Sequence, residues 1–429
     1  MCLFDSTTVT DIGLAIKVNN LYFRPMRTLI LLIALLTCTG SYSQNLDELS
    51  NAQWVNDLDD LTQAIKAHHA KPYNSLNGEY FNNRIDNLSY RMGELSTAEK
   101  LLEFIKLSAA IGDGHTTVQS LEYFKLYPII PFWFDNELRA VWTSAEYKEV
   151  AGWKITAINN KPLNEVSQAL ADLIPKNEND YYKMHWNQYW LRNANALHAA
   201  GITESDASAT FTFEKNGEKR TIALQSLPQE AYEQTTWVSG YRKVPKFLMR
   251  KNEPIWFDNP DEYTLYMNWN YNPDDKTTKD IASALQDSLN AHSIVHLVID
   301  LRSNRGASKG IAETFTKKIA KTDFADHGRI FIITGRETFG EAIEDINLFR
   351  EEFEVVLVGE PPGQKPQSYA DPYPITLTHS GLKASIATDW VEYQERVSQD
   401  FLMDQTILPN YELRDEGRDE VLEWIILQP

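Results

Sequence analysis

The sequence IVHLVIDL at residues 294–301 is an almost uninterrupted apolar run, and the loop sequence RSNRGA follows it at residues 302–307. An apolar run that ends in a glycine-containing loop is typical of a strand buried on both faces, as strands of parallel sheets are. Shorter runs of the same kind recur at residues 330–333 and 355–358. They predict further strands of one buried sheet.

Helical patterns separate these strands, and a further strand is expected at residues 263–269. The predicted helices cover residues 277–289, 309–319 and 341–349. Alternation of strand and helix predicts a parallel sheet with right-handed crossovers. We therefore expect an α/β core over residues 254–429, which returns to β-structure after Tyr369 and closes with a helix at residues 419–427.

Residues 44–120 form a region with helical periodicity. Apolar residues recur at three- and four-residue steps in residues 55–65, and a second periodic stretch covers residues 80–92. A third helix is predicted to begin at Ser96, because Ser96 and Glu99 have the spacing of a capping box. Glycines at 112 and 114 indicate the turn that ends it.

Residues 121–230 predict a small β-rich module. Short apolar runs at residues 127–134 and 138–142 indicate strands, and the stretch 211–224 predicts a hairpin that turns at Asn216 and Gly217. The aromatic sequence YYKMHWNQYW at residues 181–190 predicts a helix that packs against this module. A ligand platform is the alternative role for the same stretch.

The N-terminal residues 1–43 are predicted to be an upstream extension and a signal peptide. A basic residue precedes an apolar run of about nine residues, and small residues follow it, which is the three-part form of a secretory signal over Met26–Ser43. A membrane-spanning helix needs about 20 apolar residues, so no stable span is expected. The expectation is export to a bacterial periplasm or secretion. Lipid anchoring at Cys38 is the alternative.

Composition excludes several classes of function. The 429 residues carry a formal net charge of −19, which disfavours binding to nucleic acid because phosphate contacts need surplus Lys and Arg. The chain has 2 cysteines, and both precede the expected cleavage site, so neither a disulfide framework nor a thiolate zinc site is expected. His68 and His69 are adjacent and lack the i,i+4 spacing of a zinc pair. No metal and no cofactor is predicted.

Ligands of parallel sheets bind beyond the carboxyl ends of the strands, so the loops after the predicted strands are candidate sites. Three such loops begin at Asp300, Thr334 and Gly359, and a fourth polar loop, residues 112–116, ends the helical region. Each loop combines glycine with polar side chains. We therefore expect the functional site where these loops meet.

These loops resemble the motifs of the tail-specific, or C-terminal-processing, serine peptidases, a family that includes the tricorn core and the interphotoreceptor retinoid-binding protein repeats. DGHTTV at residues 113–118 is similar to the family's D-G-H-T, and VIDLRSNRGA at residues 298–307 to its D-L-R-x-N-x-G-G. TFGEAIED at residues 338–345 stands where the family has T-[AF]-S before a helix. VGEPPGQK at residues 358–365 resembles V-G-x-x-T-x-G-K, and GRDEVLE at residues 417–423 also fits.

The resemblance implies a parallel-sheet core like those of ClpP and crotonase, an N-terminal helical region and a PDZ-like module. It also implies hydrolysis of peptide bonds by a serine that a lysine or a histidine activates. The residues that it makes candidates for binding or oxyanion stabilisation are Gly306, Ala307, Glu341, Asp300 and Arg302. Its substrate class is peptide or unfolded protein.

The sequence departs from the family pattern at the nucleophile. The matching position is Gly340, which has no hydroxyl and cannot attack a carbonyl. Lys365, 25 residues further on, and His115 remain as candidate bases. Loss of the nucleophile typically costs on the order of 10⁶ in kcat, while the rest of the site can persist. We therefore expect an exported pseudoenzyme with a peptide-binding cleft.

Two other readings stay open. In the first, the chain is an active serine-type peptidase that uses another hydroxyl, such as Thr338 or Ser308, or a different alignment. The alternative roles of these residues are structural: Thr338 forms a hydrogen bond within its turn, and Ser308 caps a helix. In the second reading, the chain is a purely structural envelope protein.

Overall fold

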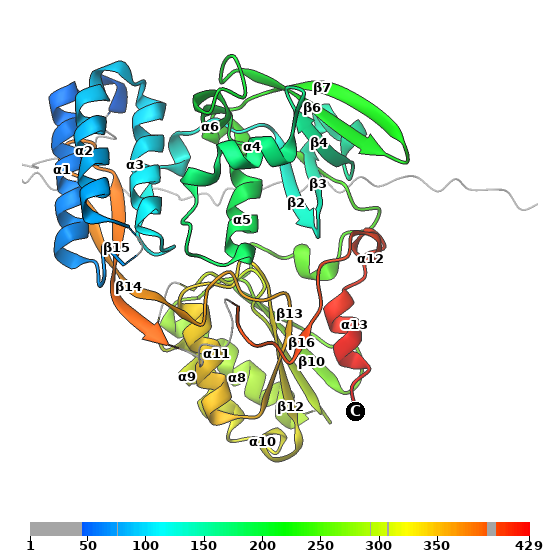
Figure 1. Cartoon of the computed structure of the whole chain (residues 1–429). Helices are drawn as coiled ribbons and strands as arrows, with labels where there is room; N and C mark the ends of the chain where they lie inside the picture. The colour runs from blue at the N-terminus through cyan, green and yellow to red at the C-terminus, as the bar shows by residue number, and fades with distance from the viewer. Residues whose placement is uncertain (1–44, 75, 292, 307–308, 393–399) are drawn as a thin grey trace, which may run out of the picture. The chain divides into compact units, whose positions relative to one another are not determined.

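The computed structural model describes residues 45–74, 76–291, 293–306, 309–392 and 400–429 (Figure 1). These residues belong to one compact unit, Gln44–Pro429. The predicted signal peptide, both cysteines, Ala307 and Ser308 lie outside the described residues. Among the helices that are described, none has the length and apolarity needed to cross a membrane.

A mixed, mostly parallel sheet forms the centre of the C-terminal part, in the strand order β16-β13-β12-β11-β10-β9. Its strands are β9 (Ile255–Asp258), β10 (Thr264–Trp269), β11 (His296–Asp300), β12 (Arg329–Thr334), β13 (Val355–Gly359) and β16 (Gln405–Thr406). Strands β10 to β13 are parallel, as the sequence predicts, and β16 extends the parallel set. Strand β9 is antiparallel to β10, so the sheet is not purely parallel.

The alternating side chains of the strands build a core on each face of this sheet. On one face, Leu297 and Ile299 pack with α8 (Asp275–Ala291), α9 (Ile311–Ile319) and α11 (Glu341–Glu352). On the other face, Val298 packs with residues of α13 (Glu420–Ile426). Burial on both faces explains why the strand at residues 294–301 reads as a continuous apolar run.

Three helices make up most of the N-terminal part: α1 (Asn51–His68), α2 (Gly78–Arg91) and α3 (Thr97–Ile111). The predicted capping box at the start of α3 is present, because the Ser96 side chain accepts from the Glu99 N–H and the Glu99 carboxylate accepts from the Ser96 N–H. A second capping box, between Ser50 and Gln53, starts α1. Each box satisfies backbone N–H groups that the first turn of a helix leaves without partners.

An antiparallel sheet forms the middle part, in the order β2-β3-β4-β6-β7. Its elements are β2 (Ile129–Phe134), β3 (Glu137–Ser144), β4 (Lys154–Ile158), β5 (Lys161–Pro162), α4 (Leu163–Ala169), α5 (Asp180–Trp190), α6 (Ala194–Ala199), β6 (Ser208–Lys215), β7 (Glu218–Gln225), α7 (Gln229–Glu233) and β8 (Trp237–Ser239). The predicted hairpin is β6–β7, and its turn residues Asn216 and Gly217 both have positive φ. Positive φ at both positions is the requirement of a type I′ turn.

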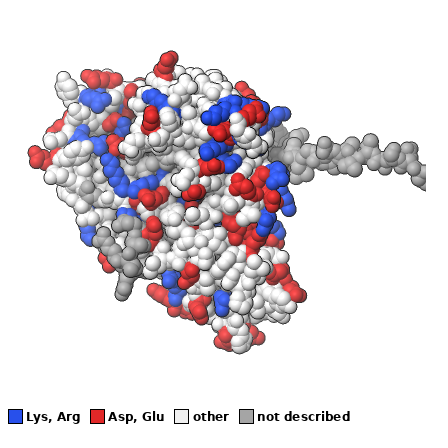
Figure 2. All heavy atoms as spheres, turned by 45° about the vertical axis from the view of Figure 1, so that its right-hand side comes forward, with Lys and Arg blue, Asp and Glu red and all other residues white. Residues whose placement is uncertain are grey.

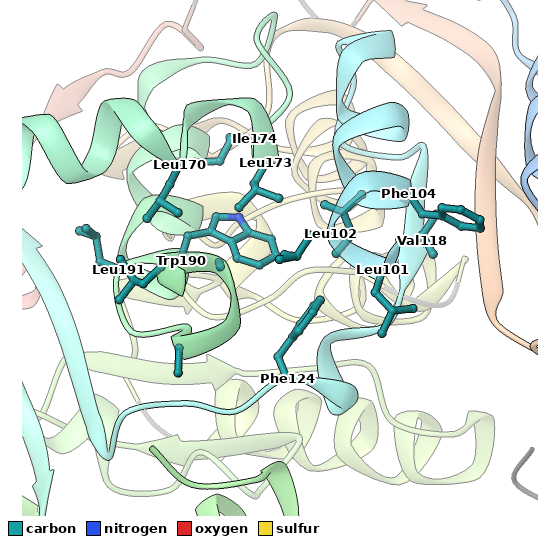
Figure 3. Packing of buried hydrophobic residues seen from close by; sticks show 14 of the residues in the cluster. Leu101, Leu102, Phe104, Val118, Phe124, Leu170, Leu173, Ile174, Trp190 and Leu191 are labelled. Atoms are coloured by element: carbon teal, nitrogen blue, oxygen red, sulfur yellow. The ribbon is translucent and has the colours of Figure 1, made fainter. Parts of the chain in front are cut away.

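The aromatic stretch at residues 181–190 is helix α5, and it packs as predicted. Trp190 is buried against leucines of α3 and of the segment that precedes α5 (Figure 3). The labelled neighbours include Leu101, Leu102, Leu170 and Leu173. Helix α5 therefore joins the helical part to the β-rich part.

A third, three-stranded sheet was not expected from the sequence. Its order is β1-β15-β14, with β1 (Thr117–Gln119), β14 (Gln367–Thr376) and β15 (Lys383–Glu392). The hairpin β14–β15 runs from the core to the N-terminal helices (Figure 1). Asp57 of α1 holds the turn of this hairpin by accepting the N–H groups of His379 and Ser380, each at 2.7 Å. Residues 117–119 and 367–392 thus form one sheet, although they are far apart in the sequence.

The remaining described α-helices are α10 (Phe324–His327) and α12 (Tyr411–Asp415). On the face of the molecule shown in Figure 2, acidic and basic side chains are interspersed. The excess of acidic residues in the whole chain therefore does not form a uniform acidic surface on this face.

Candidate active site

The candidate site lies where the loops after β11 and β12 meet the loop that precedes β1. Gly340 is the N-cap of α11, and its backbone has φ 62° and ψ −131°. A Cβ atom built on Gly340 would lie 3.8 Å from Nε2 of His115 and 3.1 Å from the carbonyl oxygen of Arg305. The position that matches the nucleophile therefore faces the histidine.

His115 is held in place by its surroundings. Its ring is buried and stacks on Phe339, with the ring centroids 4.5 Å apart. Burial lowers the pKa of His115 to about 4, although Asp113 and Asp371 favour the charged form. Nδ1 of His115 is buried and has no hydrogen-bond partner among the described residues. The imidazole is therefore neutral at neutral pH.

Asp113 organises the turn that presents His115. One of its carboxylate oxygens accepts the N–H groups of His115 and Thr116, at 2.8 and 2.7 Å. The other oxygen lies 2.9 Å from Nε2 of His69. Because Nδ1 of His69 accepts the N–H of Lys71, Nε2 of His69 carries the hydrogen that is donated to Asp113. The sequence did not indicate this contact, since residues 69 and 113 are far apart.

The loop after β11 approaches the start of α11 closely. Gly306 has φ 66°, and a Cβ atom there would lie 2.4 Å from the backbone nitrogen of Glu341. The side chain of Asn304 accepts the N–H of Gly306 at 2.8 Å, and its carbonyl oxygen accepts the N–H of Phe339. Glycine at 306 thus allows the two backbones to lie side by side. Ala307, the other oxyanion candidate, lies outside the described residues.

Lys365 is not brought together with Gly340 and His115. The preceding residue, Gln364, reaches Gly340 instead, and its side-chain oxygen accepts the Gly340 N–H at 2.7 Å. Lys365 lines a separate polar cavity of about 780 Å³, together with residues such as Glu178. In this structure, His115 is the base nearest to the nucleophile position.

Glu178 of the polar cavity links it to the turn of His115. Its carboxylate accepts the N–H of Gly114 at 2.8 Å, and its second oxygen is buried without a hydrogen-bond partner in the described part of the chain. Burial raises the pKa of Glu178 to about 7. No sequence motif indicates this residue, because it stands in a polar segment without a pattern.

Asp300 and Arg302 lie in a buried ion-pair network. Arg302 donates to Asp300 and also to Asp419, which precedes α13, with a closest distance of 2.6 Å in both cases. Neither residue lines the cavity around Gly340. Their contacts tie the end of the chain to the loop after β11, and give them no direct access to a ligand beside Gly340.

A cavity of about 310 Å³ surrounds Gly340. Glu341, the first residue of α11, lines it with His115, Gly306 and Lys309. Burial and the neighbouring Glu344 raise the pKa of Glu341 to about 7. The exposed pair Lys309 and Asp371 stands at its rim, so the cavity opens to solvent.

Thr338 occupies the turn and not the cavity. Its hydroxyl donates to the carbonyl oxygen of Leu301 at 2.8 Å and accepts the N–H of Gly335 at 3.0 Å. The side chain is buried. These contacts bear out the structural role that the sequence predicts for Thr338, whereas Ser308 lies outside the described residues.

Among the described residues, no cluster of His, Cys, Asp and Glu could hold a metal ion.

Several solved structures are similar to this chain, and mature CPAF has a similar fold. Mature CPAF in complex with lactacystin aligns with 85% of this chain and 96% of that chain, at 10% identity and a TM-score of 0.59. The tricorn protease gives a TM-score of 0.41, at 11% identity, over 88% of this chain and 36% of that chain. The photosystem II D1 C-terminal processing protease gives 0.39, at 11% identity, over 84% and 94%.

No protein-family model matches the sequence, and no curated protein matches it significantly. At these identities, the structural matches concern the fold. The resemblance to the tail-specific, or S41, peptidases that the motifs predict is confirmed as a similarity of fold.

Proposed function

We propose that this chain is an exported, peptide-binding homologue of the tail-specific peptidases that has lost the ability to cleave peptide bonds. The observation that carries the proposal is Gly340, which stands at the start of a helix opposite Nε2 of His115 and has no hydroxyl. The other parts of a serine-peptidase site persist around it. A base, a helix N-terminus and a cavity open to solvent all meet there.

The geometry favours His115 over Lys365 as the base of the ancestral reaction. Nε2 of His115 lies 3.8 Å from the Cβ position of residue 340, so a serine hydroxyl there would reach it. Lys365 lines another cavity. The ancestral site is therefore of the serine–histidine type in this proposal.

An extended peptide has a place to bind beside this site. Strand β1 stands at one end of the three-stranded sheet, and among the described strands it pairs only with β15. Thr117, its first residue, lines the cavity around Gly340. Peptides commonly bind by adding a strand to such an edge. The PDZ-like role of the β-rich part and export through residues 26–43 are further elements of the proposal.

A back-mutation tests this function. Gly340→Ser and the parent chain are compared for hydrolysis of an unfolded protein and for binding of extended peptides. We expect peptide binding by both and hydrolysis by Gly340→Ser alone. The parent's hydrolysis of the unfolded protein would overturn the proposal.

Two second-site variants assign the base in the back-mutant. Adding His115→Phe to Gly340→Ser should abolish the restored hydrolysis, whereas adding Lys365→Ala should leave it. The reverse pattern would assign the reaction to a serine–lysine pair. If Gly340→Ser folds and stays inactive, peptide binding by the parent still decides the binding half of the proposal.

A further inference from the structure

An apolar hollow of about 320 Å³ adjoins the cavity around Gly340. The two share Gly114, Thr117 and Arg305 in their linings. The apolar hollow lies between α3, β1 and α5, and its large apolar side chains are Ile105, Leu121, Leu173, Tyr182, Trp186 and Trp190. A ligand can therefore place an apolar group in this hollow and a reactive group beside His115.

The space left by the side chain of residue 340 lies between two hydrogen-bond acceptors. A Cβ atom there would lie 3.1 Å from the carbonyl oxygen of Arg305 and 3.8 Å from Nε2 of His115. A water oxygen needs more room than a bonded carbon, so it lies further out than the Cβ position, in the cavity that His115 and Gly340 line. There it donates one hydrogen to Nε2 of His115, whose ring hydrogen is then on Nδ1, and keeps a lone pair for attack.

The start of α11 supplies a donor for a developing negative charge. Glu341 is the first residue of the helix, so its N–H has no acceptor within the helix. Gly306 leaves the approach to this N–H open, because any Cβ at 306 would lie 2.4 Å from the nitrogen. The helix N-terminus adds a favourable electrostatic field for an oxyanion.

We propose that the cavity around Gly340, together with the apolar hollow, hydrolyses activated carboxylic esters with apolar acyl groups. A water molecule is the attacking group instead of a serine hydroxyl. This activity goes beyond the proposed binding of peptides. The acyl chain lies in the apolar hollow, and the ester carbonyl lies between Gly340 and the N–H of Glu341.

Water and the ester are the only reactants. The water oxygen forms a bond to the carbonyl carbon while one water proton passes to Nε2 of His115, and the oxyanion is held by the Glu341 N–H. The tetrahedral intermediate then breaks its bond to the alcohol oxygen, which takes the proton from His115. The products are the carboxylic acid and the alcohol, and no acyl-enzyme forms.

Esters fit this site better than amides for a chemical reason. An amine must be protonated before it leaves, whereas an alcohol of low pKa leaves with little help. A buried histidine whose pKa is lowered to about 4 is a weak base that stays neutral at neutral pH. It can direct water at a reactive ester, whereas cleavage of a peptide bond also needs the serine hydroxyl that residue 340 lacks.

Hydrolysis of 4-nitrophenyl esters tests the proposal on the full chain. We expect His115→Phe, which keeps a ring on Phe339, to lower kcat/KM by about 10²-fold, the usual contribution of a general base. Gly340→Ala, whose methyl group crowds the water position, should cause a loss of similar size. The control His327→Phe changes an exposed histidine and should leave the rate unchanged. No hydrolysis above the buffer rate, or equal rates in the parent and His115→Phe, would overturn the proposal.

Mass spectrometry tests for the absence of a covalent step. After an acid quench during turnover, we expect the parent to have its unmodified mass and Gly340→Ser to carry the acyl group. An acyl adduct on the parent would show that another hydroxyl attacks, and would contradict the role of water.

The apolar hollow is tested by chain length. The octanoate ester should give a higher kcat/KM than the acetate ester in the parent, and Gln119→Trp, at an exposed residue of the hollow, should remove this preference. Gln225→Trp, at an exposed strand residue outside the hollow, is the matched control. If both variants keep the preference for the octanoate ester, the hollow is not the subsite of the acyl group. Peptide binding, measured separately, is unaffected by failure of this inference.

Discussion

At Gly340 the backbone has a positive φ of 62°, a conformation that residues with a Cβ rarely adopt. A serine at this position would store strain, which functional sites often contain. Glycine at 340 has neither this strain nor a hydroxyl. It therefore stabilises the turn before α11, beside His115 and the Glu341 N–H.

The stability of Gly340→Ala tests this explanation. We expect a loss of about 1–3 kcal/mol, because alanine has the unfavourable φ and its Cβ lies 3.1 Å from the Arg305 carbonyl oxygen. Gly201→Ala is the matched control, since Gly201 has φ 66° and no atom within 4 Å of its Cβ position. Urea unfolding should show the larger loss at residue 340. Equal losses would mean that the contact with Arg305 costs nothing.

His115 gives the folded state a defined dependence on pH. Burial lowers its pKa to about 4 from about 6.5 in an unfolded chain. Between these values the unfolded chain binds the proton and the folded chain does not, so this contribution to stability falls as pH drops from about 6.5 to about 4. His115→Phe should remove this contribution. Unfolding of the two chains in urea at pH 7 and pH 4.5 measures it, and a difference that stays constant with pH would contradict the buried, neutral histidine.

At the scale of elements, capping boxes set the starts of α1 and α3. Ser96→Ala should cost about 1 kcal/mol, because it removes the acceptor of the Glu99 N–H. Thr97→Ala, one residue further into the helix, is the control and should have a smaller effect. Thermal unfolding of the two variants compares them, and equal shifts would show that the box does not hold the helix start.

The elements were predictable where local patterns define them. The parallel strands and the hairpin turn at Asn216 follow from apolar runs and from turn chemistry. The pairing of β1 with β15 was not predictable, since Thr117 and Ser385 are joined by no local signal. For the site, the motifs indicated Gly340 and His115, but could not decide that Gln364, and not its neighbour Lys365, reaches Gly340.

At the scale of the whole molecule, the site depends on a connection between parts of the chain that are far apart in the sequence. His115 comes from the N-terminal part and Gly340 from the C-terminal part, and the sheet β1-β15-β14 joins these parts. The backbone carbonyl of His115 also accepts from Ser385 of β15 at 2.9 Å. The position of the histidine opposite Gly340 is therefore a property of the long-range fold.

Asp57 provides a test of this connection at a distance from the site. Its buried carboxylate accepts two N–H groups from the turn of the β14–β15 hairpin. Hydrogen bonds to charged groups contribute about 1.5–3 kcal/mol each, so Asp57→Ala should loosen the hairpin markedly. Asp60→Ala is the matched control, because Asp60 accepts only the N–H of Thr378 from this turn and is less buried. Hydrogen exchange should show faster exchange in β15 and β1 for Asp57→Ala than for Asp60→Ala. Unchanged protection of β1 would mean that the position of His115 does not depend on the hairpin.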